Sequence, residues 1–154
     1  MIWNQWYAVL ATTELTPGRL FAARRMGEDL VFARDVDGRP FCLRDRCAHR
    51  GAALSKGRLA AHMVECPFHG FRYDSSGRGR LIPANGKNAP VPPRFQVSSW
   101  RTFEKHGFIW IWWGDTRSGW RRDCRRPFRH TGDDQQWMQI RTRPCSEVRA
   151  ASLK

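Results

Sequence analysis

The sequence lacks long hydrophobic runs and any recognisable leader. No apolar stretch approaches the ~20 residues that a membrane-spanning helix needs. The first residues, 1–6, lack the basic and apolar segments of a secretory signal. We therefore expect a soluble cytoplasmic protein with no membrane partner.

Acidic residues are scarce: 14 Asp and Glu stand against 27 Lys and Arg, which gives a formal net charge of +13. Such a balance makes nucleic acid or an acidic protein surface the first partners to consider. The sequence contains neither paired zinc-finger spacing nor a basic region that runs into heptads. We therefore expect no nucleic-acid partner and interpret most of the charge as a solvated basic surface.

Helical periodicity is nearly absent before residue 115, where alternating, β-branched and aromatic runs take its place. Strands are predicted over residues 6–11, 20–24, 30–34, 39–44, 63–65, 71–73, 80–82, 95–103 and 108–113. Turn signals lie between them, including Asp37-Gly38, and the proline-rich segment 83–93 is expected to be an ordered loop. Short strands separated by turns predict an all-β fold, a small antiparallel sandwich or barrel.

A disulfide framework is not expected, because the 5 cysteines are an odd number in a chain without a secretion signal. Cys42 lies in an alternating stretch and is interpreted as a small buried hydrophobic residue. Two other cysteines, Cys47 and Cys66, each stand close to a histidine, His49 and His69 respectively. A glycine follows each cluster and permits close approach of the backbone to a ligand. Two such loops can bring two thiolates and two imidazoles around one inorganic centre.

Three interpretations of these loops compete. One zinc ion can take all four side chains in a tetrahedron, as in a structural module. A [2Fe–2S] cluster can instead take both thiolates on one iron and both imidazoles on the other. Ordinary buried cysteines beside surface histidines explain the paired arrangement poorly. Structural zinc sites usually pair like ligands at spacings of about two to five residues. Because each loop here mixes one Cys with one His, the spacing favours the two-metal centre.

The two clusters resemble the cluster-binding boxes of Rieske [2Fe–2S] proteins. A wider resemblance, over about residues 5–115, is to the amino-terminal Rieske domain of aromatic ring-hydroxylating oxygenase α subunits. It is carried by the segments Ala53-Leu54-Ser55, Phe71-Arg72-Tyr73-Asp74, Ile82-Pro83-Ala84 and Gly107-Phe108-Ile109-Trp110. The resemblance implies a Rieske-type antiparallel β-sandwich with one [2Fe–2S] cluster. It also implies that Cys47 and Cys66 bind the inner iron, and that His49 and His69 bind the outer iron.

The resemblance distinguishes two branches of the superfamily. Respiratory Rieske proteins carry an additional cysteine in each box, which forms a disulfide, and Ala52 and Phe68 stand at those places here. They also carry a serine just after the second box, where this chain has Phe71. Fewer hydrogen bonds to the cluster sulfurs lower the reduction potential, so we expect a low-potential cluster of oxygenase or ferredoxin type. Tyr73 can still donate one hydrogen bond to a cysteine sulfur.

The resemblance implies electron transfer within a Rieske non-haem iron oxygenase. It implies that the chain accepts an electron from a reductase or ferredoxin and passes it to a mononuclear-iron oxygenase domain, with a homo-oligomer as a candidate assembly. Arg50 and Arg72 flank the imidazoles in the sequence and are candidates to steer an acidic partner. A stand-alone Rieske ferredoxin is the alternative function, and a zinc-bound structural module is a third.

The sequence departs from the family after residue 115. Family α subunits continue into a domain that holds iron on two histidines and a carboxylate, whereas only His130 remains in this part of the chain. We therefore predict no catalytic residue and expect that this chain alone does not hydroxylate an aromatic compound. Residues 116–154 are expected to be an irregular arginine-rich tail. It is interpreted as a truncated or frame-shifted start of a catalytic domain, or as the docking tail of a genuine short protein.

Overall fold

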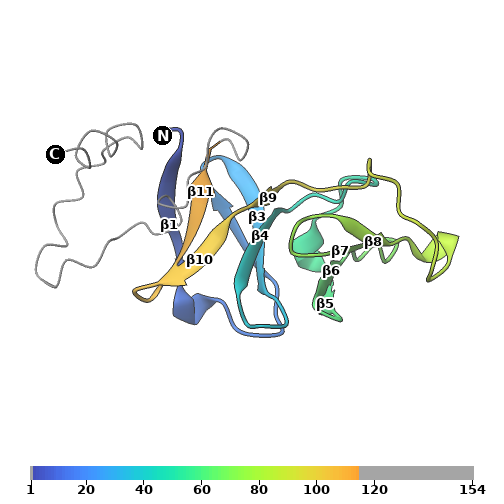
Figure 1. The fold of residues 1–154 in the computed structure, drawn as a ribbon, viewed down its shortest axis with the longest axis horizontal. Helices are drawn as coiled ribbons and strands as arrows, with labels where there is room; N and C mark the ends of the chain where they lie inside the picture. The colour runs from blue at the N-terminus through green and yellow to red at the C-terminus, as the bar shows by residue number, and fades with distance from the viewer. Residues whose placement is uncertain (1, 115–154) are drawn as a thin grey trace, which may run out of the picture. The chain divides into compact units, whose positions relative to one another are not determined.

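A computed structural model describes residues 2–114, which form an all-β domain with three short 3-10 turns (Figure 1). The strands are β1 (Gln5–Ala11), β2 (Phe21–Arg25), β3 (Glu28–Arg34), β4 (Pro40–Arg44), β5 (Arg58–Ala60), β6 (Met63–Glu65), β7 (Arg72–Tyr73), β8 (Gly79–Leu81), β9 (Ser99–Trp100), β10 (Thr102–Lys105) and β11 (Phe108–Trp113). The 3-10 turns span Thr12–Glu14, Leu54–Lys56 and Pro83–Asn85. Every strand pair is antiparallel, so the predicted all-β antiparallel class is confirmed.

The strands form three sheets, with the orders β1-β11-β10, β2-β3-β4-β9 and β5-β6-β7-β8. Figure 1 shows the second sheet between the first and the third. Strand β3 explains this arrangement, because it is apolar on both faces. Leu30 and Phe32 pack into a core with β1 and β11, whereas Val31 and Ala33 pack into a second core with the β5–β8 sheet. Successive residues of a strand point to opposite faces, so one continuous apolar run serves both cores.

The turn predicted at Asp37-Gly38 joins β3 to β4. Gly38 has a positive φ of 75°, which glycine adopts without steric cost. The Asp35 carboxylate accepts hydrogen bonds from the backbone N–H groups of Asp37 and Arg39, both at 2.9 Å. Local sequence chemistry therefore accounts for this hairpin without help from the rest of the fold.

One strand prediction is wrong, and one strand was not predicted. Residues 95–103 do not form one strand: the chain leaves β9, which pairs with β4, and enters β10, which pairs with β11. Arg101 lies at this change of sheet, where its carbonyl accepts a hydrogen bond from the Trp112 N–H at 3.0 Å. Strand β5 was not predicted: its three residues form a strand by pairing with β6, a contact that the local sequence pattern does not show. The other predicted strands are present with ends shifted by at most two residues.

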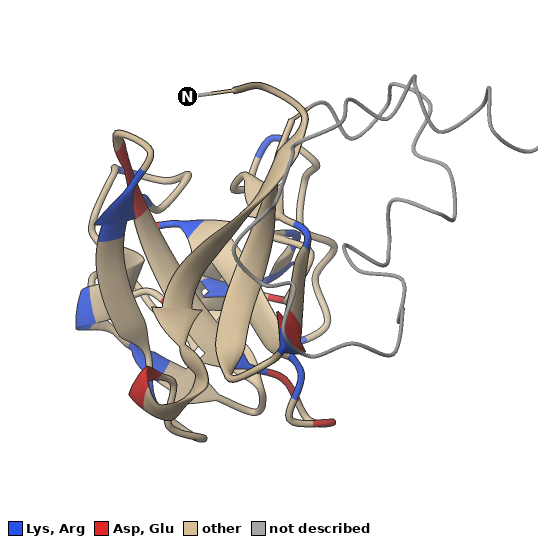
Figure 2. Ribbon diagram, turned by 90° about the vertical axis from the view of Figure 1, so that its left-hand side faces the viewer, with Lys and Arg blue, Asp and Glu red and all other residues tan. Residues whose placement is uncertain are grey.

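Lys, Arg, Asp and Glu residues are distributed over several strands and turns of the described domain (Figure 2). Residues 2–114 contain no helix with the length and hydrophobicity needed to cross a bilayer. The predicted domain limits, 5–115, remain a prediction. The predicted arginine-rich tail at 116–154 lies outside the described residues.

One ion pair joins β3 to β10. The Arg34 guanidinium, with a side chain 11% exposed, contacts both carboxylate oxygens of Glu104 at 2.6 and 3.2 Å. It also donates to the carbonyls of Leu15 at 3.0 Å and Gly38 at 2.8 Å. The hydrogen bond from Arg34 holds the pKa of Glu104 below its usual value.

Replacing Glu104 with glutamine is expected to lower the free energy of unfolding near neutral pH by about 2 kcal/mol, because Arg34 loses its charged partner. The folded-state pKa of Glu104 is depressed. The stabilisation is therefore present above the unfolded-state pKa and is lost as pH falls through the folded-state pKa. Urea unfolding at a series of pH values should show the difference between wild type and Glu104→Gln shrinking toward acid. Equal stabilities at neutral pH would contradict this role of Glu104.

Candidate functional site

The two Cys/His loops follow β4 and β6 and adopt the same backbone conformation. In the first loop, the Gly51 N–H donates to the Cys47 carbonyl at 2.9 Å, and the Cys47 N–H donates to the Ala52 carbonyl at 2.8 Å. In the second loop, the corresponding bonds link Gly70 to Cys66 at 3.1 Å and Cys66 to Phe71 at 2.8 Å. Gly51 and Gly70 have φ values of 73° and 69°, a left-handed conformation that closes each loop. The glycine after each cluster thus adopts a conformation that few other residues adopt, as its position in the sequence predicts.

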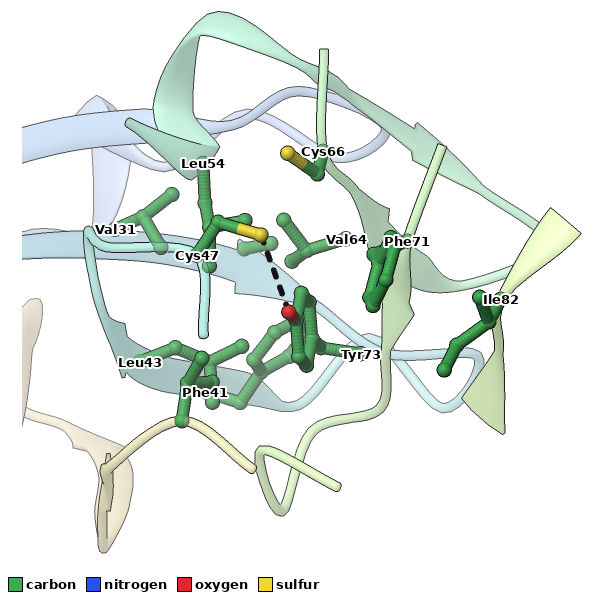
Figure 3. Packing of buried hydrophobic residues seen from close by; sticks show 12 residues of the cluster. Val31, Phe41, Leu43, Cys47, Leu54, Val64, Cys66, Phe71, Tyr73 and Ile82 are labelled. Carbon is green, nitrogen blue, oxygen red and sulfur yellow. Dashed lines mark hydrogen bonds between the residues drawn. The ribbon is translucent and has the colours of Figure 1, made fainter. Parts of the chain in front are cut away.

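The loops bury their cysteines. Cys47 and Cys66 are each only 3% exposed and belong to the core that includes Leu54, Val64 and Phe71. Figure 3 shows the two sulfur atoms pointing into the same space at the edge of this core. Burial raises the pKa of the Cys66 thiol, the neighbouring Cys47 raises it further, and N–H groups of the second loop act in the opposite direction. Because a metal binds the thiolate, loading this pair with metal releases protons.

The loops expose their histidines. His49 and His69 are solvent-exposed, and their ring centroids lie 4.8 Å apart. The Phe71 ring stacks on His49 with centroids 4.8 Å apart and planes only 10° from parallel. Partial desolvation lowers the pKa of His49, and the charges of His69 and Arg50 lower it further. The neutral imidazole, which is the metal-binding form, is therefore favoured at His49.

Tyr73 contacts Cys47 from within the hydrophobic core. It is fully buried, and its hydroxyl lies 3.2 Å from the Cys47 Sγ and 3.2 Å from the Ala48 nitrogen (Figure 3). The Ala48 N–H donates to the hydroxyl oxygen, so the hydroxyl proton is free to be donated to a Cys47 thiolate. Burial, and then the contact with Cys47, raise the pKa of Tyr73 and keep it protonated. The expected hydrogen bond between Tyr73 and a cysteine sulfur is thus present.

The four donors form two chemically different pairs. The thiols are buried side by side and the imidazoles lie exposed at the loop tips. Among residues 2–114, no three Cys, His, Asp or Glu side chains converge where one metal ion could bind all of them. A tetrahedral zinc ion needs convergence on one point, whereas a two-iron unit needs one pair of donors at each end. The residues present therefore fit a [2Fe–2S] unit better than a single ion.

Arg50 and Arg72 were the two arginines expected to steer an acidic partner, and the structure distinguishes between them. Arg72 lies in β7 and donates to the Glu65 carboxylate at 2.7 Å, so its charge is already paired. Arg50 is exposed, as expected. Arg46 was not singled out in the sequence, yet with Arg44 and Arg50 it lines a cavity of about 360 Å³ beside His49. Arg46 directly precedes Cys47 in the chain, but the sequence does not show the cavity, because Gln96, Val97 and Ser98 from a distant segment also line it.

Residues 5–101 match the family described as the Rieske [2Fe-2S] domain. The chain belongs to this family. The predicted Rieske-type β-sandwich and Rieske-type [2Fe–2S] cofactor are therefore confirmed. Cys47, His49, Cys66 and His69 all lie inside the matched region.

Similar proteins are oxygenases and related oxidoreductases. The chain is 39% identical to methylxanthine N1-demethylase NdmA of Pseudomonas putida, over 69% of this chain and 31% of that protein. It is 37% identical to chloroplastic chlorophyllide a oxygenase of Chlamydomonas reinhardtii, over 73% of this chain and 17% of that protein. A crystal structure of dicamba monooxygenase superposes with a TM-score of 0.67 and 33% identity, over 73% of this chain and 35% of that one. The chain thus spans about a third or less of the length of the relatives it matches.

Replacing Tyr73 with phenylalanine is expected to lower the reduction potential of the cluster by on the order of 50 mV, the equivalent of one hydrogen bond worth about 1 kcal/mol. The hydroxyl stabilises the more negative reduced state by donating toward Cys47. Potentiometric titration followed by visible absorption measures the change. Tyr7→Phe is the matched control, because Tyr7 lies in β1 and its hydroxyl bonds to the backbone of Ile2. Equal midpoint potentials for wild type and Tyr73→Phe would show that the Tyr73 hydroxyl does not influence the reduction potential of the cluster.

Proposed function

We propose that this chain transfers single electrons through its [2Fe–2S] cluster as the Rieske part of a non-haem iron oxygenase. Cys47 and Cys66 bind the inner iron, and His49 and His69 bind the outer iron. One observation carries the assignment: two loops of the same conformation bury two thiols and expose two imidazoles 4.8 Å apart. The cluster, when bound, stores and releases one electron.

The protein environment supports this function at each end of the site. The core around Cys47 and Cys66 keeps water from the sulfur ligands, and Tyr73 supplies a hydrogen bond to one of them. The imidazoles of His49 and His69 lie at the surface, so a partner can approach the outer iron closely. Phe71 holds the ring plane of His49 by stacking. Electrons would therefore enter and leave on the histidine side.

The partners follow from this assignment. The donor is a reductase or ferredoxin, and the acceptor is a mononuclear-iron oxygenase domain, within an assembly that includes more than one copy of the chain. The names of relatives support this, since one is the oxygenase component of a chloroacetanilide N-alkylformylase and another is the iron–sulfur subunit of a monooxygenase system.

Anaerobic reconstitution with iron and sulfide tests the proposal. The expected product contains two irons and two acid-labile sulfides per chain, absorbs in the visible range and gives an electron paramagnetic resonance signal when reduced with dithionite. Bound zinc without labile sulfide in the purified protein would instead assign a structural zinc module. A reduction potential near the positive end of the Rieske range would contradict the low-potential branch.

A further inference from the structure

We propose that the loop tips form a docking surface for an acidic electron-carrier protein, with Phe68 as its apolar anchor and Arg46 and Arg50 as its charged contacts. The inference rests on the proposed function and adds to it the partner's chemistry and the residues that recognise it. We call these three residues and the two exposed imidazoles the tip surface.

Phe68 is an unusual residue to leave in solvent. It lies between Cys66 and His69, its side chain is 58% exposed, and its ring centroid is 4.0 Å from that of His69. Aromatic side chains, phenylalanine included, are enriched at protein interfaces relative to the rest of the protein surface. A partner that covers Phe68 also covers His69, so burial of the anchor brings the two redox centres together.

Two arginines of the first loop region supply positive charge on the same side of the domain as His49. Arg46 and Arg50 are exposed and form no ion pair with any described residue. The two carboxylates that precede the loops, Asp45 and Glu65, have their own partners within the domain. Asp45 accepts two hydrogen bonds from Ser55, and Glu65 is paired with two arginines of its own sheet. The tip surface therefore attracts carboxylates from outside the domain.

A cavity provides the place for such a carboxylate. It measures about 360 Å³, opens beside the first loop and is lined by His49, Arg46, Arg50 and Arg44. Arg44 is bound to Glu28 at 2.6 Å, which leaves the other two guanidinium groups available. Guanidinium groups bind carboxylates through paired N–H donors. An acidic side chain entering the cavity thus fixes the orientation of its protein against the imidazoles.

The test measures how fast the reconstituted protein is reduced by a chemically reduced, acidic plant-type ferredoxin in stopped flow. The second-order rate constant is expected to fall about fivefold between low and moderate salt, because screening weakens steering. Arg50→Glu and Arg46→Glu are each expected to lower it about tenfold at low salt, and Phe68→Ser to lower it several-fold at all salt concentrations.

The controls lie at the opposite end of β4, in the turn before Pro40. Arg39→Glu makes the same charge change at a side chain 76% exposed, and Val36→Ser makes a similar apolar-to-polar change at a side chain 68% exposed. Both should change the rate less than twofold. Reduction by dithionite, and the midpoint potential, are measured for every variant, so that damage to the cluster is separated from loss of docking.

The outcomes are distinguishable. A protein without a reducible cluster overturns the proposed function itself. A normal cluster reduced by ferredoxin at a rate that neither salt nor the Arg46, Arg50 and Phe68 variants change overturns the docking surface alone. Self-association that Arg50→Glu abolishes, with an unchanged ferredoxin rate, assigns the tip surface to a second copy of the chain and also overturns the proposal.

Discussion

Replacing His69 with cysteine should leave a cluster in the protein and lower its midpoint potential by on the order of 100 mV. The physical reason is charge. A neutral imidazole becomes an anionic thiolate, so the cluster carries one more negative charge and the extra electron of the reduced state is less stable. The exposed position of His69 at the loop tip leaves room for the smaller side chain. Potentiometric titration monitored by electron paramagnetic resonance gives the midpoint directly.

His62→Cys is the matched control for this change. His62 is also exposed and lies in the turn between β5 and β6, outside both loops. Its replacement should leave the midpoint unchanged. The same midpoint for His69→Cys and wild type would mean that His69 does not bind the iron, and the assignment of the outer pair would have to be withdrawn.

Replacing Cys66 with alanine should abolish cluster assembly altogether. Cys66 is 3% exposed and lies beside Cys47, and within residues 2–114 the remaining free thiol, Cys42, belongs to the core on the other side of β3. An iron held there by Cys47 alone would lack the second of its two thiolate ligands. Iron and labile sulfide analysis after reconstitution should therefore fall from two of each per chain to near zero.

Cys42→Ala is the matched control, because Cys42 is buried even more completely than Cys66. It lies in β4 opposite Phe32 and Trp100, in the core on the other side of β3. Burial raises its pKa well above the usual value, which keeps it an inert thiol. The variant should lose some stability and keep its full iron content. Full iron content in Cys66→Ala would rule out Cys66 as a ligand.

The low-potential assignment depends on which groups surround the sulfurs. Phe71, at the place of a hydrogen-bonding serine in respiratory Rieske proteins, stacks on His49 and has no proton to donate to a sulfide. Tyr73 supplies a hydrogen bond to Cys47. The Tyr73→Phe titration isolates that hydrogen bond, and the absolute midpoint tests the branch assignment as a whole.

The local parts of the structure follow from short stretches of sequence. The hairpin at Gly38 could be predicted because its turn is stabilised by its own residues, including Asp35. The loop glycines could be predicted for the same reason, since Gly51 and Gly70 each close a turn within six residues. Residues 95–103 could not be predicted correctly, because the change from one sheet to another at Arg101 depends on β4 and β11.

By itself, the sequence determined the kind of chemistry: two cysteines and two histidines in paired loops, the all-β class, and the absence of a serine at Phe71. These are properties of residue type and spacing. Only the tertiary structure decided that Arg72 is paired with Glu65 whereas Arg46 lines the cavity beside His49. The reason is that the partners of a charged side chain depend on which segments meet: β6 pairs with β7, and Gln96, Val97 and Ser98 line the same cavity as Arg46.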